Sequence, residues 1–497
     1  MVRIPLDSRG LSPLRADARA VAIPAVLALL ACCITVVAGT LSALAYTPFE
    51  PTLRALGLTL QGLRPLHETF AFGWAFLAGI TVVQAWMVET GGALRGAERA
   101  RFWLQIGLWS LAGSWTVVAL LAGRYTGREY AGADLPATAA LLVGWLCFVW
   151  NYLGRAGFSL RGKPVYQFMW FTSLWLYVFT TVESHAYLLD GLSREPLRDL
   201  AVQWKSNRVM VGAFNQLLYG ALMWVSSRIR GNEDYARSRT AFALFGVGVL
   251  NTFANYGHHT YHLPQSAWIH GIAFGVSMLE IVILAKCLLD LAKVLRAAPA
   301  DPRHEASLRF SRSVTRWTFL MLALAMLLSL PSLNSIAHGT HVITAHAMGA
   351  MIGIDSMIGW AAFAWILLQF LEPGERSVRP QRVRRYALAF DLLLGAWLVV
   401  LVARGLAAGL ARYAGPEAPD LSRLVAWFPA LLAGLGDALA LAILALSLEW
   451  LASFLRVALS GPSACEWPPS STPSASRERS SSPPSASQAR ELQRVHR

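Results

Sequence analysis

Charged residues and cysteines are both scarce in this sequence of 497 residues. Only 14% of the residues are Asp, Glu, Lys or Arg, whereas soluble domains carry about a quarter, so a soluble multidomain enzyme is excluded. The five cysteines form neither a CxxC pair nor a CxxCH motif, which excludes a zinc knuckle and a covalently attached c-type haem. The net charge is +14, but the basic residues lie between apolar runs and in the tails. That distribution is typical of membrane topology and argues against nucleic acid as a partner.

Apolar residues make up 55% of the chain and are collected in runs long enough to cross a bilayer, for which about 20 residues suffice. Twelve such runs occur, at 21–44, 67–88, 102–122, 137–154, 166–188, 207–228, 239–259, 266–292, 313–333, 341–371, 386–408 and 425–456. We therefore predict an all-α integral membrane protein in which residues 21–460 form one bundle of twelve transmembrane helices. Residues 1–20 are predicted to be an amino-terminal arm, and the tail 461–497, rich in Ser, Pro and Arg, is predicted to be disordered.

The loops between the runs alternate in charge. Arg and Lys are abundant between runs two and three, four and five, six and seven, eight and nine, and ten and eleven. The intervening loops are poorer in basic residues, and residues 260–265 and 334–340 contain none. By the positive-inside rule, the arginine-rich loops and both termini are expected to be cytoplasmic.

This topology brings histidines from distant runs to one depth. His67 begins run two, His258 and His259 end run seven, and His346 lies one to two turns inside run ten. With the predicted orientation, all four lie in the outer part of the bilayer. Ionisable residues inside a membrane are costly and usually functional, and imidazole is the commonest metal ligand. A chance gathering of interfacial histidines is the competing interpretation.

The spacing of these residues favours haem over a structural zinc site. His346 and Met348 are two positions apart on a helix, so they point to nearly opposite sides and can serve two different cofactors. His258 and His259 are about 100° apart and can reach one metal if the helix end loosens there. Imidazoles accompanied by a thioether and by no cysteine suit haem iron.

Five short stretches resemble the large subunit of bacterial nitric oxide reductase, a family in the haem-copper oxidase superfamily. The stretches are 63–69 (LRPLHET), 127–130 (GREY), 257–261 (GHHTY), 277–280 (SMLE) and 337–348 (AHGTHVITAHAM). They occur in the family's order, and the resemblance covers roughly residues 20–460 with a matching number of spans. It implies a haem-copper oxidase subunit I-like bundle in the bacterial cytoplasmic (inner) membrane.

The resemblance also implies ligands for two b-type haems and a non-haem metal. His67 would be an axial ligand of a low-spin haem b, and His346 would be the proximal ligand of a high-spin haem b. His258 and His259 would bind a second metal, usually iron, that faces the high-spin haem. Met348 stands where the family has the second axial histidine of the low-spin haem, and it would be the second axial ligand of that haem. Packing is the alternative role for Met348.

Two glutamates match family positions near these cofactors. Glu280 matches a membrane glutamate linked to proton delivery and is the candidate catalytic residue; a carboxyl group neutralised by a hydrogen bond is an equal alternative. Glu129 matches an outer-loop glutamate associated with calcium near the haem propionates, and an exposed loop charge is the alternative there.

Departures from the family pattern fall mainly on the second metal site. The family's third metal-binding histidine corresponds to Asn207, and the glutamate four residues on corresponds to Val211. An amide oxygen is a much weaker iron ligand than an imidazole, so the non-haem iron, or another divalent metal in its place, is expected to be labile. Met348 is the other departure, and a His/Met haem would have a raised reduction potential.

The implied function is respiratory electron transfer to nitric oxide, 2 NO + 2 e⁻ + 2 H⁺ giving N₂O and H₂O. A docked c-type cytochrome subunit or a quinol would supply the electrons. The alternatives are a relative with other gas chemistry, such as NO dismutation or O₂ reduction, and a non-catalytic haem protein for electron transfer or sensing. A transporter without a cofactor is a third alternative, disfavoured by the shared depth of the histidines.

Overall fold

Helices account for all the regular secondary structure in the residues that the computed structural model describes, which are 12–126, 128, 132–299, 301, 304–370, 380–414 and 428–460. All the described residues belong to one compact unit. The tail 461–497, for which the sequence predicts disorder, lies outside the described residues.

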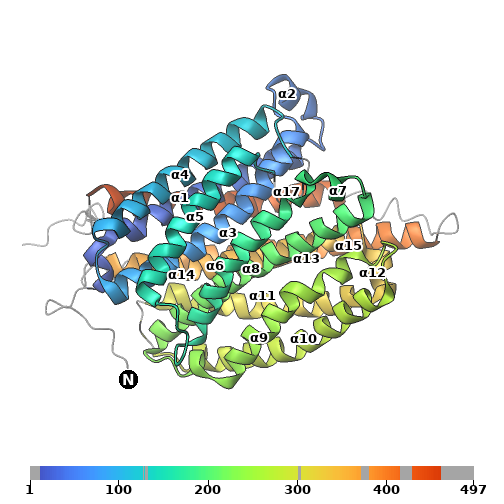
Figure 1. Cartoon of the computed structure of the whole chain (residues 1–497). Coiled ribbons are helices and arrows are strands. Elements are labelled where there is room, and N and C mark those ends of the chain that lie inside the picture. Colours follow the sequence, from blue (N-terminus) through green and yellow to red (C-terminus); the bar gives the residue numbers. More distant parts are fainter. Residues whose placement is uncertain are drawn as a thin grey trace, which may run out of the picture. The chain divides into compact units, whose positions relative to one another are not determined.

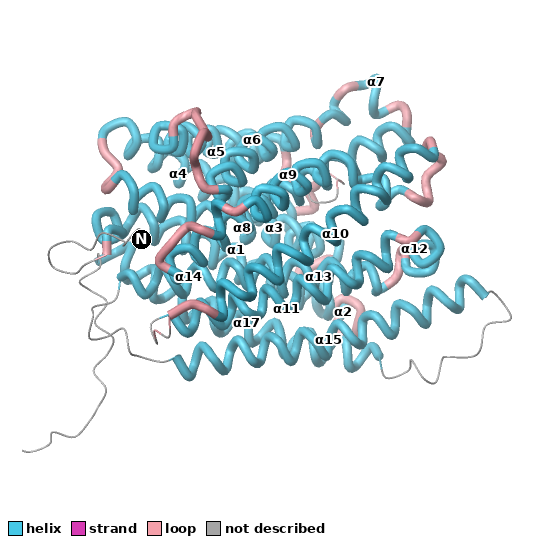
Figure 2. The backbone as a smooth tube through the Cα atoms, turned by 90° about the horizontal axis from the view of Figure 1, so that it is seen from below, coloured by secondary structure: helices cyan, strands magenta, loops and turns pink. Residues whose placement is uncertain are grey.

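The long helices run side by side, and loops connect them at their ends (Figures 1 and 2). In chain order the elements are η1 (Pro13–Asp17), α1 (Ala18–Leu44), α2 (Glu50–Ala55), α3 (Leu60–Gly91), α4 (Gly96–Leu121), α5 (Leu135–Ala156), α6 (Val165–Ser184), η2 (Ala186–Leu188), α7 (Asp190–Ser193), α8 (Pro196–Arg230), η3 (Tyr235–Arg237), α9 (Arg239–Ala254), η4 (Asn255–Thr260), α10 (Ala267–Arg296), α11 (Glu305–Ser329), α12 (Pro331–Ala337), α13 (His341–Ala350), η6 (Met351–Ser356), α14 (Met357–Phe370), α15 (Pro380–Ala414) and α17 (Phe428–Ser460). The short helices α2, α7 and α12 lie at the same end of the long ones (Figure 1).

Each of the twelve apolar runs coincides with at least one helix. Among the described residues, nine helices are long and apolar enough to cross a membrane, and a tenth span is obtained if α11 and α12 are joined. The other two predicted spans correspond to α6 and α9, which are not among them. Helix α9 has only 16 residues and continues as the 3₁₀ helix η4, whereas α6 has 20 residues but is rich in Tyr, Trp, Thr and Ser. The all-α membrane fold is confirmed, and among the described residues nine or ten of the twelve predicted spans meet the length and composition of a membrane-crossing helix.

Two spans depart from a straight α-helix for identifiable reasons. Pro331 begins α12 and has no N–H to continue α11, and Leu330 before it is extended with ψ 121°, as the proline ring requires. The two helices consequently meet at 101°. In the span that contains His346, residues Met351–Ser356 form the π-helix η6, and such bulges often mark functional sites.

Aromatic packing fixes the helix of His67 against the span of His346. The Trp74 indole of α3 donates a hydrogen bond of 2.9 Å to the Ser356 hydroxyl of η6, and its ring lies edge-on to Phe363 of α14 at 5.6 Å between centroids. Gly359 allows this approach, because a Cβ there would lie 3.0 Å from the Trp74 ring. The two predicted haem-ligand helices are therefore held in a fixed relation.

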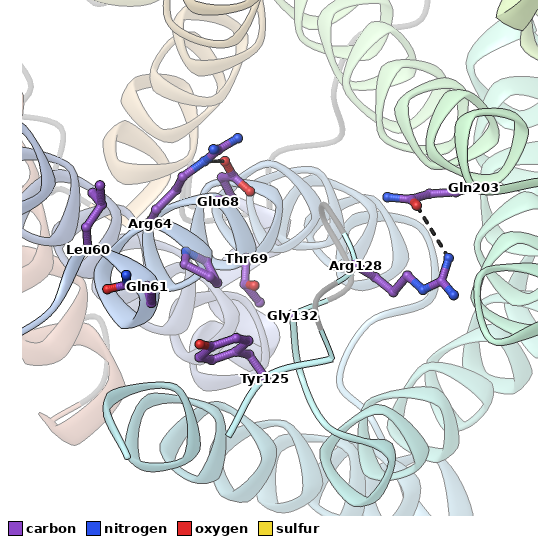
Figure 3. A pocket seen from close by; sticks show the side chains of 10 residues that line it. Leu60, Gln61, Arg64, Glu68, Thr69, Tyr125, Arg128, Gly132 and Gln203 are labelled. Atoms are coloured by element: carbon purple, nitrogen blue, oxygen red, sulfur yellow. Dashed lines mark hydrogen bonds and ion pairs between the residues drawn. The ribbon is translucent and has the colours of Figure 1, made fainter. Parts of the chain in front are cut away.

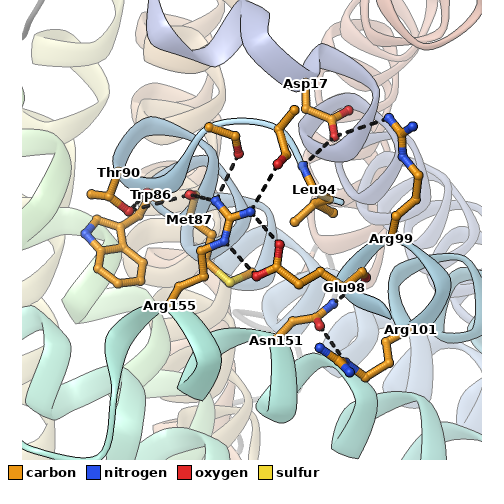
Figure 4. A network of polar contacts seen from close by, with 12 residues as sticks. Asp17, Trp86, Met87, Thr90, Leu94, Glu98, Arg99, Arg101, Asn151 and Arg155 are labelled. Carbon is orange, nitrogen blue, oxygen red and sulfur yellow. Dashed lines mark hydrogen bonds and ion pairs between the residues drawn. The ribbon is translucent and has the colours of Figure 1, made fainter. Parts of the chain in front are cut away.

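A partly buried ion pair ties together the ends of α3, α4 and α5 (Figure 4). Arg155 donates to both carboxylate oxygens of Glu98 at 2.9 and 2.7 Å and to three backbone carbonyls between residues 87 and 93 at 2.8–3.3 Å. Its side chain is 9% exposed. The Cα of Gly91 lies so close that a Cβ there would collide with the guanidinium. All five N–H donors of this arginine thus have partners, and we call this group the Arg155 network.

Candidate functional site

His67 stands near the start of α3 with its ring against α1. Its Nδ1 lies 2.8 Å from the Thr35 carbonyl oxygen, and a Cβ at Gly39 would lie 2.6 Å from the same nitrogen. A backbone carbonyl that accepts from one ring nitrogen fixes the tautomer and leaves the other nitrogen free to bind a metal. The environment of His67 therefore fits an axial haem ligand that binds through Nε2.

His346 and Met348 lie on α13, whose first turn is capped by Thr340, which accepts a hydrogen bond from the Val342 N–H. The Nδ1 of His346 is buried and has no hydrogen-bond partner, while Met348 is partly buried against the main core. Buried polar atoms are normally satisfied, and the described residues supply no partner for this nitrogen. His346 is thus a candidate ligand of the second haem, whereas Met348, two positions on, points to the side of the haem predicted on His67.

His258 and His259 lie in η4, where the backbone tightens from the α-helix α9 into a 3₁₀ helix. Their ring centroids are 4.0 Å apart at 38°. The Nδ1 of His258 is hydrogen-bonded to the Asn255 side-chain oxygen, which also accepts from Ser277 at 2.6 Å. The ring of His259 stacks on Trp204 of α8, with centroids 5.4 Å apart and planes 5° apart. Both rings are thus held, and both are within electrostatic reach of His346.

Helix α8 supplies the side of this cluster where the sequence places a weak metal ligand. Asn207 is 7% exposed and its side-chain nitrogen has no partner, and Val211 is partly buried against the core. Gly212 lets α8 approach α9, since a Cβ there would lie 2.3 Å from the Thr252 hydroxyl. Asn207 therefore offers an uncommitted amide, and the position four residues on offers no donor.

Arg208 is the functional candidate that the sequence argument missed. It follows Trp204 by four residues on α8, so the two side chains share the face that meets His259. Its charge acts on His258, His259 and His346. Its Nε is buried and has no hydrogen-bond partner, and Arg208 forms no ion pair with the described residues. The available signal was a charged residue inside an apolar run, which is rare unless it is functional.

A line of acidic and phenolic side chains leads away from Arg208. Glu280 of α10 accepts a hydrogen bond from the Asn251 amide and lies within electrostatic reach of Arg208. Tyr219, three turns along α8, interacts electrostatically with both Glu280 and Asp355. Asp355 is 5% exposed in the π-helix η6, and one of its carboxyl oxygens has no partner. Asp355 was also missed, although it too is an acid inside an apolar run.

A cavity of about 480 Å³ lies beside the start of α3, on the side that the sequence predicts to be outer (Figure 3). It is lined by Arg64, Glu68 and Arg128 among others. Arg128 forms an ion pair of 2.8 Å with Asp199, and Arg64 one of 2.8 Å with Glu68. Arg64 precedes the predicted haem ligand His67 by about one turn on α3, and Arg128 lines the same cavity. Glu129, the expected calcium ligand, lies outside the described residues.

The donor set around His258 and His259 does not fit a second metal. Within the part of the chain that the structure describes, no group of three or more His, Cys, Asp or Glu side chains is placed to hold a metal ion. Two imidazoles and an amide are a weak set for iron, and the Arg208 charge acts on both imidazoles. A dication beside a buried guanidinium would also be repelled.

Comparison with known families decides the class of this protein. The family of cytochrome c and quinol oxidase polypeptide I matches residues 19–434. The chain belongs to this family. It therefore has the haem-copper oxidase subunit I fold, as the sequence predicts, and it is a multi-pass membrane protein of the haem oxidoreductase class, whose members take electrons from cytochrome c or quinol.

Solved structures agree on the fold. The chain is similar to one from a heme-copper terminal oxidase dimer determined by cryo-EM, with a TM-score of 0.65 and 14% sequence identity. The similarity covers 90% of this chain and 84% of that one. No curated protein sequence matches the chain.

Proposed function

We propose that this chain is a respiratory subunit that carries two b-type haems and reduces a diatomic gas, nitric oxide first among them. The observation that carries the proposal is the position of His346. Its partnerless imidazole lies within electrostatic reach of the held pair His258 and His259, in a chain whose family binds haem. A haem on His346 would supply an iron at which a gas molecule is bound and reduced.

The chain's own residues are proposed to receive electrons on one side of α13 and to bind the gas on the other. We call the surroundings of His258, His259 and His346 the chamber. His67, fixed by the Thr35 carbonyl, and Met348 are proposed to hold the low-spin haem that receives electrons. Because Met348 and His346 point to nearly opposite sides of α13, the two haems would be neighbours separated by this helix. Arg64 and Arg128 in the outer cavity would attract the haem propionates.

Protons for the reaction are proposed to pass along the acidic line. Asp355 and Glu280 are both within electrostatic reach of Tyr219. Glu280 is also within electrostatic reach of Arg208, whose charge acts on His258 and His259 in the chamber. Each of these side chains exchanges protons in proteins. Orientation with both termini on the cytoplasmic side would place Asp355 on the inner side of the chamber.

The test combines haem analysis with gas consumption. Detergent-purified protein is expected to give two pyridine-haemochrome equivalents of haem b per chain and to consume NO anaerobically with a reduced electron donor. Folded protein without haem would overturn the proposal. Haem without NO consumption would favour the second candidate, a haem protein for electron transfer or sensing, which is supported by the missing third metal ligand.

A further inference from the structure

Arg208 occupies a position that no structural role explains. It makes no hydrogen bond or ion pair with the described residues, and its Nε is buried. A buried guanidinium normally has its donors satisfied, because leaving them unpaired costs free energy. The Arg155 network shows how this same fold satisfies such a group where it is structural. The Arg208 donors are therefore available to something that the chain itself does not supply.

The surroundings of Arg208 show where that missing partner would lie. Trp204, one turn earlier on the same face of α8, is stacked on His259. The Arg208 charge acts on His258, His259 and His346 from this side. Asn207 contributes a buried amide nitrogen without a partner. The chamber thus presents a fixed cation and N–H donors around the imidazole that is proposed to hold haem.

This set of groups selects an anion and rejects a cation. Guanidinium and amide N–H groups only donate hydrogen bonds, and they suit small oxygen- or nitrogen-terminated anions. A second metal would need a third strong ligand, which the described residues do not provide. Glu280, the nearest carboxylate, is already hydrogen-bonded to Asn251.

We propose that Arg208 takes the place of the second metal, so that the chamber binds a small monovalent anion, such as nitrite or azide, against the haem of His346. The chain would then carry two haems and no non-haem metal. This inference rests on the proposed function only in requiring the haem on His346. It names the chemical class of ligand that the chamber holds and the residue that holds it.

The first measurement is the metal content of the purified, full-length protein. Total iron is expected to equal haem iron, with no other transition metal near one equivalent per chain. A stoichiometric non-haem metal that survives purification would overturn this inference and leave the proposed function standing. Folded protein without any haem would overturn both.

The second measurement is the affinity of the ferric protein for nitrite and for azide, followed by the shift of the Soret band. Arg208→Gln is expected to weaken both affinities about ten- to hundredfold, because a hydrogen bond to a charged group contributes about 1.5–3 kcal/mol. Arg208→Lys, which keeps the charge, is expected to lose less. Arg198→Gln is the matched control, since Arg198 lies on α8 with its side chain 58% exposed.

The variants also distinguish anion recognition from simple packing. If Arg208→Lys and Arg208→Gln weaken anion binding equally, or if neither changes it, Arg208 does not hold the anion and the inference fails. If Arg208→Gln does not fold, the metal content of the native protein and the Lys variant still decide the question.

Discussion

Two buried arginines in this protein have opposite surroundings. Arg155 joins the ends of three helices, and all of its N–H donors are matched by the Glu98 carboxylate or by backbone carbonyls. Arg208 lies among apolar spans with a buried, unpartnered Nε, and its charge acts on imidazoles and on the Glu280 carboxylate without a hydrogen bond or ion pair to any of them. Arg155 therefore has a structural role, whereas Arg208 is proposed to bind a ligand.

The difference gives a way to separate structural from functional charges in a membrane protein. Removing a charged group from water costs several kcal/mol unless its partners compensate for it. Where the chain itself compensates, as at Arg155, the charge stabilises the helix ends. Where it does not, as at Arg208, His346 and Asp355, the group is a candidate for binding something other than the chain itself.

The largest expected effects come from the histidines that are proposed to complete their coordination with haem. His346→Ala is expected to remove the high-spin haem alone, and His67→Ala the low-spin haem alone, because each imidazole is the chain's ligand on its side of α13. Pyridine haemochrome should fall from two haems per chain to one, with different optical spectra in the two variants. Loss of no haem in either variant would show that the unpartnered nitrogen of His346 is not a cofactor site.

Replacing the two arginines should have different effects on the stability of the protein. Arg155→Gln is expected to destabilise the protein by roughly 2–4 kcal/mol, because it leaves Glu98 and three carbonyls without their partner. Arg208→Leu is expected to leave the stability unchanged or raise it, since it removes a charge without a partner. Thermal unfolding of the two detergent-solubilised variants measures this. A comparable loss in both would mean that Arg208 is a structural residue.

The sequence predicted the helices better than it predicted the chemistry between them. Apolar runs of bilayer length identify helices because lipid requires every backbone group to be satisfied within the segment. Two of these helices, α9, which continues as η4, and α6, which is rich in aromatic and hydroxyl residues, are less apolar or shorter than the others. The topology also predicts that histidines of distant runs come together, and His258 and His259 are within electrostatic reach of His346.

Side-chain direction could not be predicted in the same way. Trp204 stacks on His259, and Arg208 lies one turn further on the same face of α8. This face is therefore the one that meets the chamber. That register depends on how α8 packs against η4, which no motif records. Asp355 depends likewise on the π-helix η6, whose extra residue shifts the helix face.

The next prediction tests whether the missing third ligand or the Arg208 charge prevents metal binding beside His258 and His259. Asn207→His alone is expected to gain little metal, because the Arg208 cation is still there. Asn207→His combined with Arg208→Leu offers three imidazoles without the cation and is expected to raise bound iron toward one equivalent per chain. Arg208→Leu alone is the control for the charge. Full metal occupancy in the single Asn207→His variant would show that the arginine does not exclude the metal.

The smallest expected effect is on the other side of α13, at the thioether of Met348, where the resemblance implies a histidine. If Met348 binds the iron of the low-spin haem opposite His67, Met348→His should lower the reduction potential of that haem, because thioether ligation raises it. The ferric native protein should also show the weak red charge-transfer band of a methionine ligand, and the variant should lose it. Met348→Leu is the control, because it keeps the packing against the core while removing the sulfur. An unchanged spectrum and potential in both variants would make Met348 a packing residue. Electron entry would then depend on His67 with a different partner, while the chamber around Arg208 would be unaffected, since His346 faces the other way along α13.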